Sequence, residues 1–247
     1  MSIVDSIFDN LSEWRKLPDY QLERRADIFF ACYLPDILNN GNQSIQETII
    51  PEFPIRKGTL RKGTLNDSTK LDNLSFKIDY LAVTKDLTKV FFIELKTEAK
   101  SINEDQCRRM IIAKEVGIKT LIDGILVIFK KTQAKRKYYR LLQMMERLSL
   151  IRIPNSVREI MNGNRLNGIN QLLVSKDLMN IDELYIAKNI SNYEICYILP
   201  RKSEKLSSIC SSVRQITFGD CIEVVSHESD EFSKQFANAL KRWEKES

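Results

Sequence analysis

The sequence predicts an α/β protein in which helices flank a mixed, mostly antiparallel β-sheet. Alternating apolar residues mark short strands within the first 130 residues. Apolar residues at helical spacing occur before and after these strands. The chain has 247 residues, and a chain of this length buries roughly 70% of its unfolded surface, so its core needs no disulfide or metal.

The first half of the chain begins with helices. Apolar residues at positions 3, 4, 7, 8, 11 and 14 predict an amphipathic helix, and the segment 19–38 predicts a second one. A strand is expected at 49–55, where two prolines indicate a sheet edge. The tandem repeat RKGTLRKGTL at 56–65, together with the polar residues after it, predicts a long loop.

A β-hairpin and a parallel crossover are expected next. The segments 75–83 and 89–97 predict the two strands of the hairpin. A helix follows at 103–116, and Gly117 is expected to end it. The apolar run ILVIF at 125–129 predicts a buried strand. Together these segments predict a right-handed strand–helix–strand crossover.

The chain divides near residue 150. Residues 1–150, which end in a helix at 131–150, are expected to form the core with its N-terminal helices. Residues 151–247 are expected to form an α/β extension packed on that core, with one single domain as the alternative. The weaker patterns of this extension predict three strands and a closing helix, at 183–187, 193–199, 215–225 and 230–243.

Composition narrows the class of protein. No apolar run approaches the ~20 residues that span a bilayer, and acidic residues occur within the first 17 positions, so we expect a cytoplasmic protein without a signal peptide. The five cysteines are scattered, which favours free thiols in a reducing compartment. The single histidine, His227, argues against a multi-histidine zinc site or histidine-based catalysis. The net charge of +5 does not by itself indicate nucleic acid.

The predicted hairpin carries an acidic residue in each strand. A symmetric turn pairs Leu81 with Phe92 and Asp79 with Glu94, and it places Lys96 on the same face. Opposed residues have Cβ atoms ~4.5–5.5 Å apart, where two like charges are destabilising unless they are neutralised. A hard divalent cation bound through oxygen ligands neutralises them. Lys96 would then orient a metal-bound water or steady a phosphate.

These residues resemble a known family. The order of Asp79, then Glu94-Leu95-Lys96 after a short hairpin, then a helix bearing Gln106, resembles the PD-(D/E)XK nuclease superfamily. The resemblance covers roughly residues 17–130. The element order also resembles the restriction-endonuclease-like αβββαβ core of that superfamily. Ile78 stands where the family motif has proline.

The resemblance implies a role for each motif residue. Asp79, Glu94, the Leu95 carbonyl and Glu23 would hold Mg²⁺, for which Mn²⁺ would substitute. Lys96 would assist the attacking water. Gln106 would join the catalytic set, unless it is only the N3 member of a helix cap on Asn103. DNA is the implied substrate, with RNA left open, and a homodimer or a larger defence or repair complex is the implied assembly.

Basic residues form a candidate nucleic-acid surface. Positions 130–140 contain lysines, arginines and two tyrosines without an acidic residue, and the repeat loop carries further positive charge. Such residues contact phosphates or stack on bases, although a basic run is more often a solvated helix face. The candidates are Arg56, Lys57, Arg61, Lys62, Lys135, Arg136 and Lys137.

Two alternatives to a nuclease remain open. The first is a catalytically inactive nuclease-like module that binds nucleic acid or a protein partner. The second is a structural or interaction protein whose hairpin acids face solvent and are balanced by Lys77 and Lys96. Asp27 and Glu52 are further, weaker candidates for the acidic site.

Overall fold

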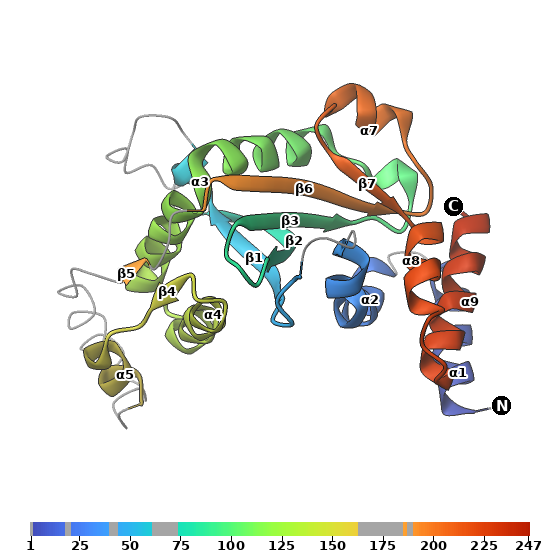
Figure 1. The fold of residues 1–247 in the computed structure, drawn as a ribbon, viewed down its shortest axis with the longest axis horizontal. Helices are drawn as coiled ribbons and strands as arrows, with labels where there is room; N and C mark the ends of the chain where they lie inside the picture. The colour runs from blue at the N-terminus through green and yellow to red at the C-terminus, as the bar shows by residue number, and fades with distance from the viewer. Residues whose placement is uncertain (1, 18–20, 40–43, 61–73, 163–184, 187–189) are drawn as a thin grey trace.

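The computed structural model describes residues 2–17, 21–39, 44–60, 74–162, 185–186 and 190–247 (Figure 1). The α-helices are α1 (Ile3–Trp14), α2 (Glu23–Leu38), α3 (Glu104–Lys131), α4 (Lys135–Arg147), α5 (Asn155–Asn162), α7 (Glu204–Ile209), α8 (Phe218–Val225) and α9 (Glu231–Lys245). The strands are β1 (Ile50–Arg56), β2 (Ser75–Val83), β3 (Lys89–Leu95), β4 (Ile151–Arg152), β5 (Tyr185–Ile186), β6 (Asn192–Leu199) and β7 (Arg214–Thr217). Two 3₁₀ turns are η1 (Lys57–Leu60) and η3 (Ala99–Ser101).

A five-stranded mixed sheet forms the centre of the molecule. Its strand order is β1-β2-β3-β6-β7, and a separate pair is formed by β4 and β5. The first three strands run antiparallel, whereas β6 is parallel to β3 and β7 is parallel to β6. The expected α/β class, with helices flanking a mixed sheet, is therefore confirmed. The sheet is not mostly antiparallel, because two of its four strand pairings are parallel.

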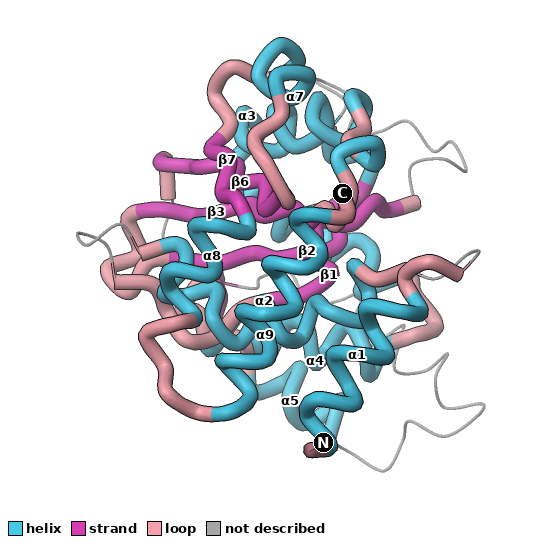
Figure 2. The backbone as a smooth tube through the Cα atoms, turned by 90° about the vertical axis from the view of Figure 1, so that its right-hand side faces the viewer, coloured by secondary structure: helices cyan, strands magenta, loops and turns pink. Residues whose placement is uncertain are grey.

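Helices cover both faces of this sheet (Figures 1 and 2). On one face, Leu81 and Phe92 pack in a core with residues of α3, α4 and α5. On the other face, Tyr80 and Ile93 pack with α1, α2, α8 and α9. Successive residues of a strand point to opposite faces, so the near-continuous apolar runs of β2 and β3 serve both cores. Each fully buried large apolar side chain contributes about 1.5–3 kcal/mol.

The register of the hairpin agrees with the prediction as far as Tyr80 and Ile93, but the predicted pair of Asp79 and Glu94 is not part of the ladder. Leu81 pairs with Phe92, and the ladder continues through Val83 and Val90. A short turn makes this register a local property of the sequence, because the turn fixes which residues stand opposite each other.

The predicted strand at 125–129 is wrong. These residues belong to α3, which continues past Gly117 after a kink in which Gly117 adopts φ 78°. Ile118, Ile122 and Ile125 repeat at helical spacing and are all buried, so the apolar run is the core-facing stripe of a helix. A Cβ atom at Gly124 would clash with the Thr59 hydroxyl of η1, which explains a glycine in mid-helix.

The parallel strand beside β3 comes from much later in the chain. It is β6, so the connection between these two parallel strands includes α3 and α4 and ends at Asn192. The strand expected at 215–225 is only partly present, because β7 ends at Thr217 and α8 begins at Phe218. The expected closing helix is confirmed as α9, which Asp230 caps. Residues on both sides of position 150 therefore share one sheet.

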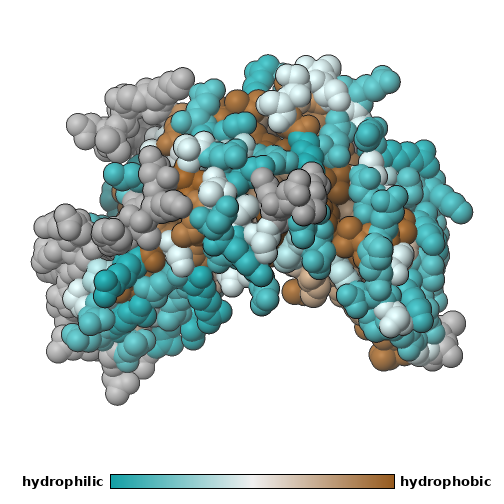
Figure 3. Space-filling model, in the orientation of Figure 1, coloured by the Kyte–Doolittle hydropathy of each residue, from teal (hydrophilic) through white to brown (hydrophobic). Residues whose placement is uncertain are grey.

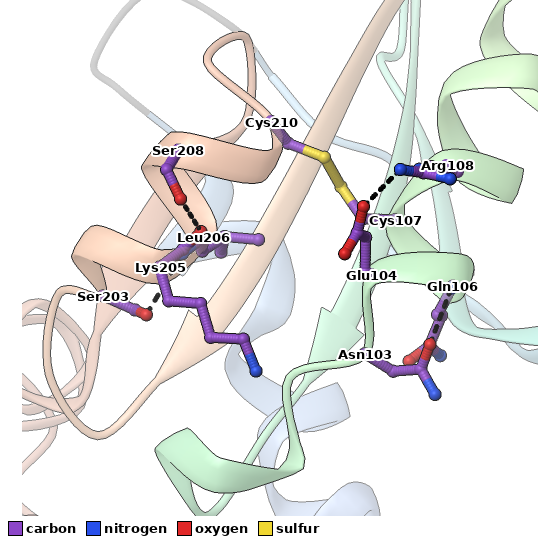
Figure 4. The surroundings of a disulfide bond; sticks show 10 residues. All are labelled: Asn103, Glu104, Gln106, Cys107, Arg108, Ser203, Lys205, Leu206, Ser208 and Cys210. Atoms are coloured by element: carbon purple, nitrogen blue, oxygen red, sulfur yellow. Dashed lines mark hydrogen bonds and ion pairs between the residues drawn. A yellow bond between two sulfur atoms is a disulfide. The ribbon is translucent and has the colours of Figure 1, made fainter.

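A disulfide joins Cys107 of α3 to Cys210 at the end of α7 (Figure 4). The expectation of free thiols is wrong for this pair and agrees with the structure for Cys32, Cys196 and Cys221. The two bonded residues are 103 positions apart, so only the packing of α7 against α3 brings them together. In the part of the chain that the structure describes, none of the helices has the length and apolar character to cross a membrane.

Candidate active site

The candidate site lies where β2 and β3 separate. Their ladder ends at the pair Tyr80 and Ile93. Beyond it, the Asp79 carboxylate accepts a hydrogen bond from the Leu95 backbone N–H, with Oδ2 2.8 Å from the nitrogen. A side chain thus replaces the backbone acceptor that β2 would otherwise supply.

The Leu95 carbonyl faces the same gap. The next backbone N–H, that of Lys96, donates to the Ile198 carbonyl of β6 at 2.9 Å. Because alternate residues of a strand bond to opposite neighbours, the N–H and C=O of Leu95 both point toward β2. The Asp79 carboxylate and the Leu95 carbonyl oxygen therefore both lie at this opening.

Glu94 is buried beside the gap, with only 1% of its surface exposed. Its Oε1 accepts hydrogen bonds from the Lys96 ammonium, at 2.7 Å, and from the Gln106 side-chain amide. Its Oε2 is buried and has no hydrogen-bond partner among the described residues. The carboxylate is therefore held through one oxygen, while the other remains available to a ligand.

The charges of the three motif residues are interdependent. Burial raises the pKa of Glu94 to about 8, and the negative charge of Asp79 adds to this effect, while Lys96 opposes it. Burial also raises the pKa of Asp79, against the Leu95 hydrogen bond and the charge of Lys96. Burial lowers the pKa of Lys96, but nearby carboxylates, Glu94 foremost, outweigh it, so the net pKa is raised. Lys96 is therefore an ammonium at neutral pH.

Gln106 combines the two roles considered from the sequence. Its backbone N–H donates to the Asn103 side-chain oxygen at 3.1 Å, as expected at the third position of a helix. Its side chain donates to Glu94 rather than returning to the cap. Gln106 thus connects the start of α3 to the buried carboxylate.

A pocket of about 410 Å³ opens onto the site. Asp79 and Leu95 line it, together with Glu23 from the start of α2. Glu23 is held by the Thr97 N–H at 3.2 Å and by the Ser101 hydroxyl at 3.3 Å. Glu94 and Lys96 are not among the lining residues but lie buried beside the pocket. Of the expected acidic set, the structure therefore places Asp79 and Glu23 at the pocket wall and Glu94 behind it.

The pocket wall also includes Asp27 and Glu52, the two weaker acidic candidates, together with residues that the sequence does not predict for the site. The remaining lining residues are Arg24, Asp27, Glu52, Ser75, Phe76, Lys77 and Tyr80. Lys77 forms an ion pair with Glu52, whose φ of 51° is unusual for a residue with a side chain. Tyr80 donates to the Asp27 carbonyl at 2.7 Å, which fixes α2 against β2. The alternation of β2, which places Lys77 and Asp79 on one face, is the available signal for Lys77.

The basic residues of the repeat loop are only partly described. Arg61 and Lys62 lie outside the described residues. Lys57 is half-buried in η1. Arg56 is half-buried at the end of β1, and its Nε is buried without a hydrogen-bond partner among the described residues.

The basic helix α4 has two distinct parts. Lys135 is 2% exposed, and its ammonium donates to the Phe129 and Lys130 carbonyls at 2.6 and 2.7 Å. It therefore satisfies the carbonyls at the end of α3 and is not positioned to contact a phosphate. Arg136 and Lys137 are exposed and remain candidates for such a contact.

The start of α4 lies next to the pocket wall. Burial raises the pKa of the Tyr138 hydroxyl, and the charge of Lys77 and a hydrogen bond with Ser75 partly offset the change. The space-filling view is hollowed on its underside between the lobe of α4 and α5 and the lobe of α1 and α9 (Figure 3). Helix α2 and strand β1, which both line the pocket, lie between these lobes in Figure 1.

The oxygen atoms of Asp79, Glu94 and the Leu95 carbonyl are of the kind that binds a hard cation. Carboxylate and carbonyl oxygens are the ligands that Mg²⁺ takes, usually one or two carboxylates with retained waters. The unpartnered Oε2 of Glu94 is a buried oxygen that such an ion would satisfy. Within the described ranges, no group of three or more His, Cys, Asp or Glu residues is arranged to hold a metal. The fit therefore rests on two carboxylates and a backbone carbonyl.

Comparison with protein-family models, curated proteins and solved structures finds no match to this chain.

Proposed function

We propose that this chain is a metal-dependent nuclease that hydrolyses phosphodiester bonds in DNA and has a restriction-endonuclease-like core. One observation carries the proposal. Asp79, Glu94 and Lys96 meet where β2 and β3 separate, and one buried oxygen of Glu94 has no partner among the described residues. A protein seldom leaves a buried carboxylate oxygen unsatisfied without a functional reason.

Mg²⁺, or Mn²⁺ in its place, would be held by Asp79, Glu94 and the Leu95 carbonyl, with Glu23 as a further acid. When bound, such an ion stabilises charge on a phosphate and lowers the pKa of a water. It would also favour the ionised form of Glu94, against the effect of burial.

The protein's own groups would supply position and charge. Lys96 keeps its proton and places a positive charge beside the carboxylates, where it orients an attacking water or a phosphate oxygen. Gln106 holds one oxygen of Glu94, which fixes the plane of that carboxylate. Glu23 is fixed by Thr97 and Ser101 at the pocket wall, so it needs little reorganisation on binding.

A nucleic-acid substrate would explain why exposed basic residues of α4 lie near an acidic pocket. Exposed Arg136 and Lys137 begin a helix whose Tyr138 lies close to pocket residues Ser75 and Lys77. Basic side chains beside an acidic pocket would hold a polyanionic backbone while the acids meet the scissile phosphate. DNA is the proposed substrate, and RNA is the comparison that the experiment includes.

A cleavage assay tests the proposal. Purified protein is incubated with circular, nicked and linear DNA and with RNA, in Mg²⁺, Mn²⁺ or EDTA. We expect cutting that requires the divalent ion and that Glu94→Gln and Lys96→Ala each largely abolish, with circular dichroism unchanged. Glu98→Gln is the matched control, because Glu98 follows the motif and pairs with exposed Lys100. Failure to cut any of these substrates would reject the nuclease.

One observation favours a catalytically inactive binding module. Glu94 is already bound by Lys96 and Gln106, so this carboxylate is partly neutralised without a metal. A module of this kind would bind DNA in EDTA and in Mg²⁺ alike and would release intact DNA. Filter binding beside the cleavage assay separates the two functions.

A further inference from the structure

A row of polar residues crosses the apolar sheet. Glu94 of β3 stands beside Tyr197 of β6, and Tyr197 stands beside Gln215 of β7. Residues paired across neighbouring strands share a face, so Tyr197 points to the same side of the sheet as Glu94. Two positions before each of them the side chains are apolar, Phe92 and Ile195.

Tyr197 differs from most buried tyrosines in its hydrogen bonding. Its side chain is fully buried, and its hydroxyl has no hydrogen-bond partner among the described residues. Buried tyrosine hydroxyls normally find one. Tyr193, four residues earlier on the same strand and face, shows the usual arrangement: it accepts from the Ile118 N–H at 2.7 Å and donates to the Ile190 carbonyl.

Two unsatisfied buried oxygens thus occur on adjacent strands, one on Glu94 and one on Tyr197. When Glu94 is ionised, as a bound cation would favour, the first is an acceptor and the second is a donor, so their hydrogen-bonding needs are complementary. The carboxylates of Glu94 and Asp79 are close enough to raise the pKa of Tyr197, after the larger effect of burial. The hydroxyl therefore keeps its proton and remains a donor at neutral pH.

We propose that Tyr197 is a positioning residue that donates a hydrogen bond, through one ordered water, to Oε2 of Glu94, whose second lone pair would remain for the cation. This inference rests on the proposed function, because it gives the bond the task of orienting Glu94 toward the cation. Carboxylates that bind metals are themselves held by hydrogen bonds, and loss of such a partner weakens metal affinity about 10–100-fold. Tyr197 would complete the set of donors around Glu94, together with Lys96 and Gln106.

Metal binding gives the first test. Mn²⁺ is titrated calorimetrically into wild type, Tyr197→Phe and Tyr193→Phe. We expect Tyr197→Phe to bind Mn²⁺ about 10–100-fold more weakly. Tyr193→Phe should bind like wild type but melt at a lower temperature, because the Ile118 N–H loses its acceptor. Binding by Tyr197→Phe that equals a measurable wild-type binding would overturn the proposal.

A double-mutant cycle in metal-free protein separates this inference from the nuclease proposal. Stability to urea is measured for Tyr197→Phe, Glu94→Ala and the double variant, at a pH above 8, where Glu94 is ionised. A hydrogen-bonded link between the two side chains makes their effects non-additive, whereas additive effects would overturn the inference. Non-additive effects in a protein that binds no Mn²⁺ and cuts nothing would support the link and reject the nuclease. Tyr193→Phe combined with Glu94→Ala is the control and should be additive.

Discussion

The Asp79 carboxylate accepts the Leu95 backbone N–H, so one side chain both ends the β2–β3 ladder and faces the pocket. These two tasks differ chemically. The hydrogen bond needs only an acceptor oxygen, whereas cation binding needs a negative charge.

Two substitutions of Asp79 should therefore separate stability from metal binding. Asp79→Asn keeps an acceptor for Leu95, so its free energy of unfolding should stay near that of wild type while Mn²⁺ binding is lost. Asp79→Ala leaves a buried N–H unpaired, which costs about 1–3 kcal/mol in addition. Urea unfolding and Mn²⁺ calorimetry measure the two effects. Equal stability of both variants would show that the Leu95 bond contributes nothing.

The start of α3 allows a similar separation. Gln106→Ala removes the donor to Glu94 but keeps the backbone N–H that Asn103 caps, so cutting should fall with little change in stability. Asn103→Ala removes the cap and should cost about 0.5–2 kcal/mol while cutting persists. Thermal melts and initial cleavage rates measure the pair. The reverse pattern would assign Gln106 to the helix cap alone.

The exposed basic residues of α4 should contribute to the affinity for DNA and to the dependence of that affinity on salt concentration. Arg136→Ala with Lys137→Ala should weaken binding and reduce the slope of log affinity against log salt by about 0.9 for each phosphate that the protein no longer neutralises. Lys135→Met is the matched control from the same helix. It should lower stability, because two carbonyls of α3 lose their donor, and leave the slope unchanged. An unaltered slope in the double variant would remove α4 from the DNA interface.

The Cys107–Cys210 disulfide should stabilise the fold. Reduction, or replacement of both cysteines by alanine, should lower the free energy of unfolding by about 2–4 kcal/mol. The urea midpoint of wild type should fall in dithiothreitol, whereas that of the double variant should not respond. Cys32→Ala is the control, since Cys32 is free and exposed. If the urea midpoint of wild type is the same with and without dithiothreitol, the disulfide does not stabilise the fold.

The parts of the site that the sequence predicts are local. Asp79 and Glu94 lie on two strands joined by a short turn, which fixes the register as far as Tyr80 and Ile93. Beyond that pair the strands separate, and the Asp79 carboxylate bonds the Leu95 N–H, which alternation does not predict. The burial of Lys135 is not predicted, because a basic pattern does not reveal a long side chain that folds back onto backbone carbonyls. The prediction for 125–129 is wrong because a short apolar stretch suits a buried strand or a buried helix equally.

The remaining errors concern contacts between distant parts of the chain. Cys107 meets Cys210, and Glu94 lies beside Tyr197, only after β6 and α7 have packed. No periodicity in the sequence encodes that juxtaposition. The parallel partner of β3 is therefore β6, which lies much later in the chain than the apolar run at 125–129 that is predicted to be this strand.

The late arrival of β6 has a consequence for synthesis on the ribosome. Glu94 is translated long before Tyr197, and at ~5–20 residues per second the wait is roughly 5–20 s. During that interval β3, apolar along nearly its whole length, has an open side that invites pairing with other chains. Rapid elongation through residues 96–199 would shorten this exposure, which ends when β6 pairs with β3.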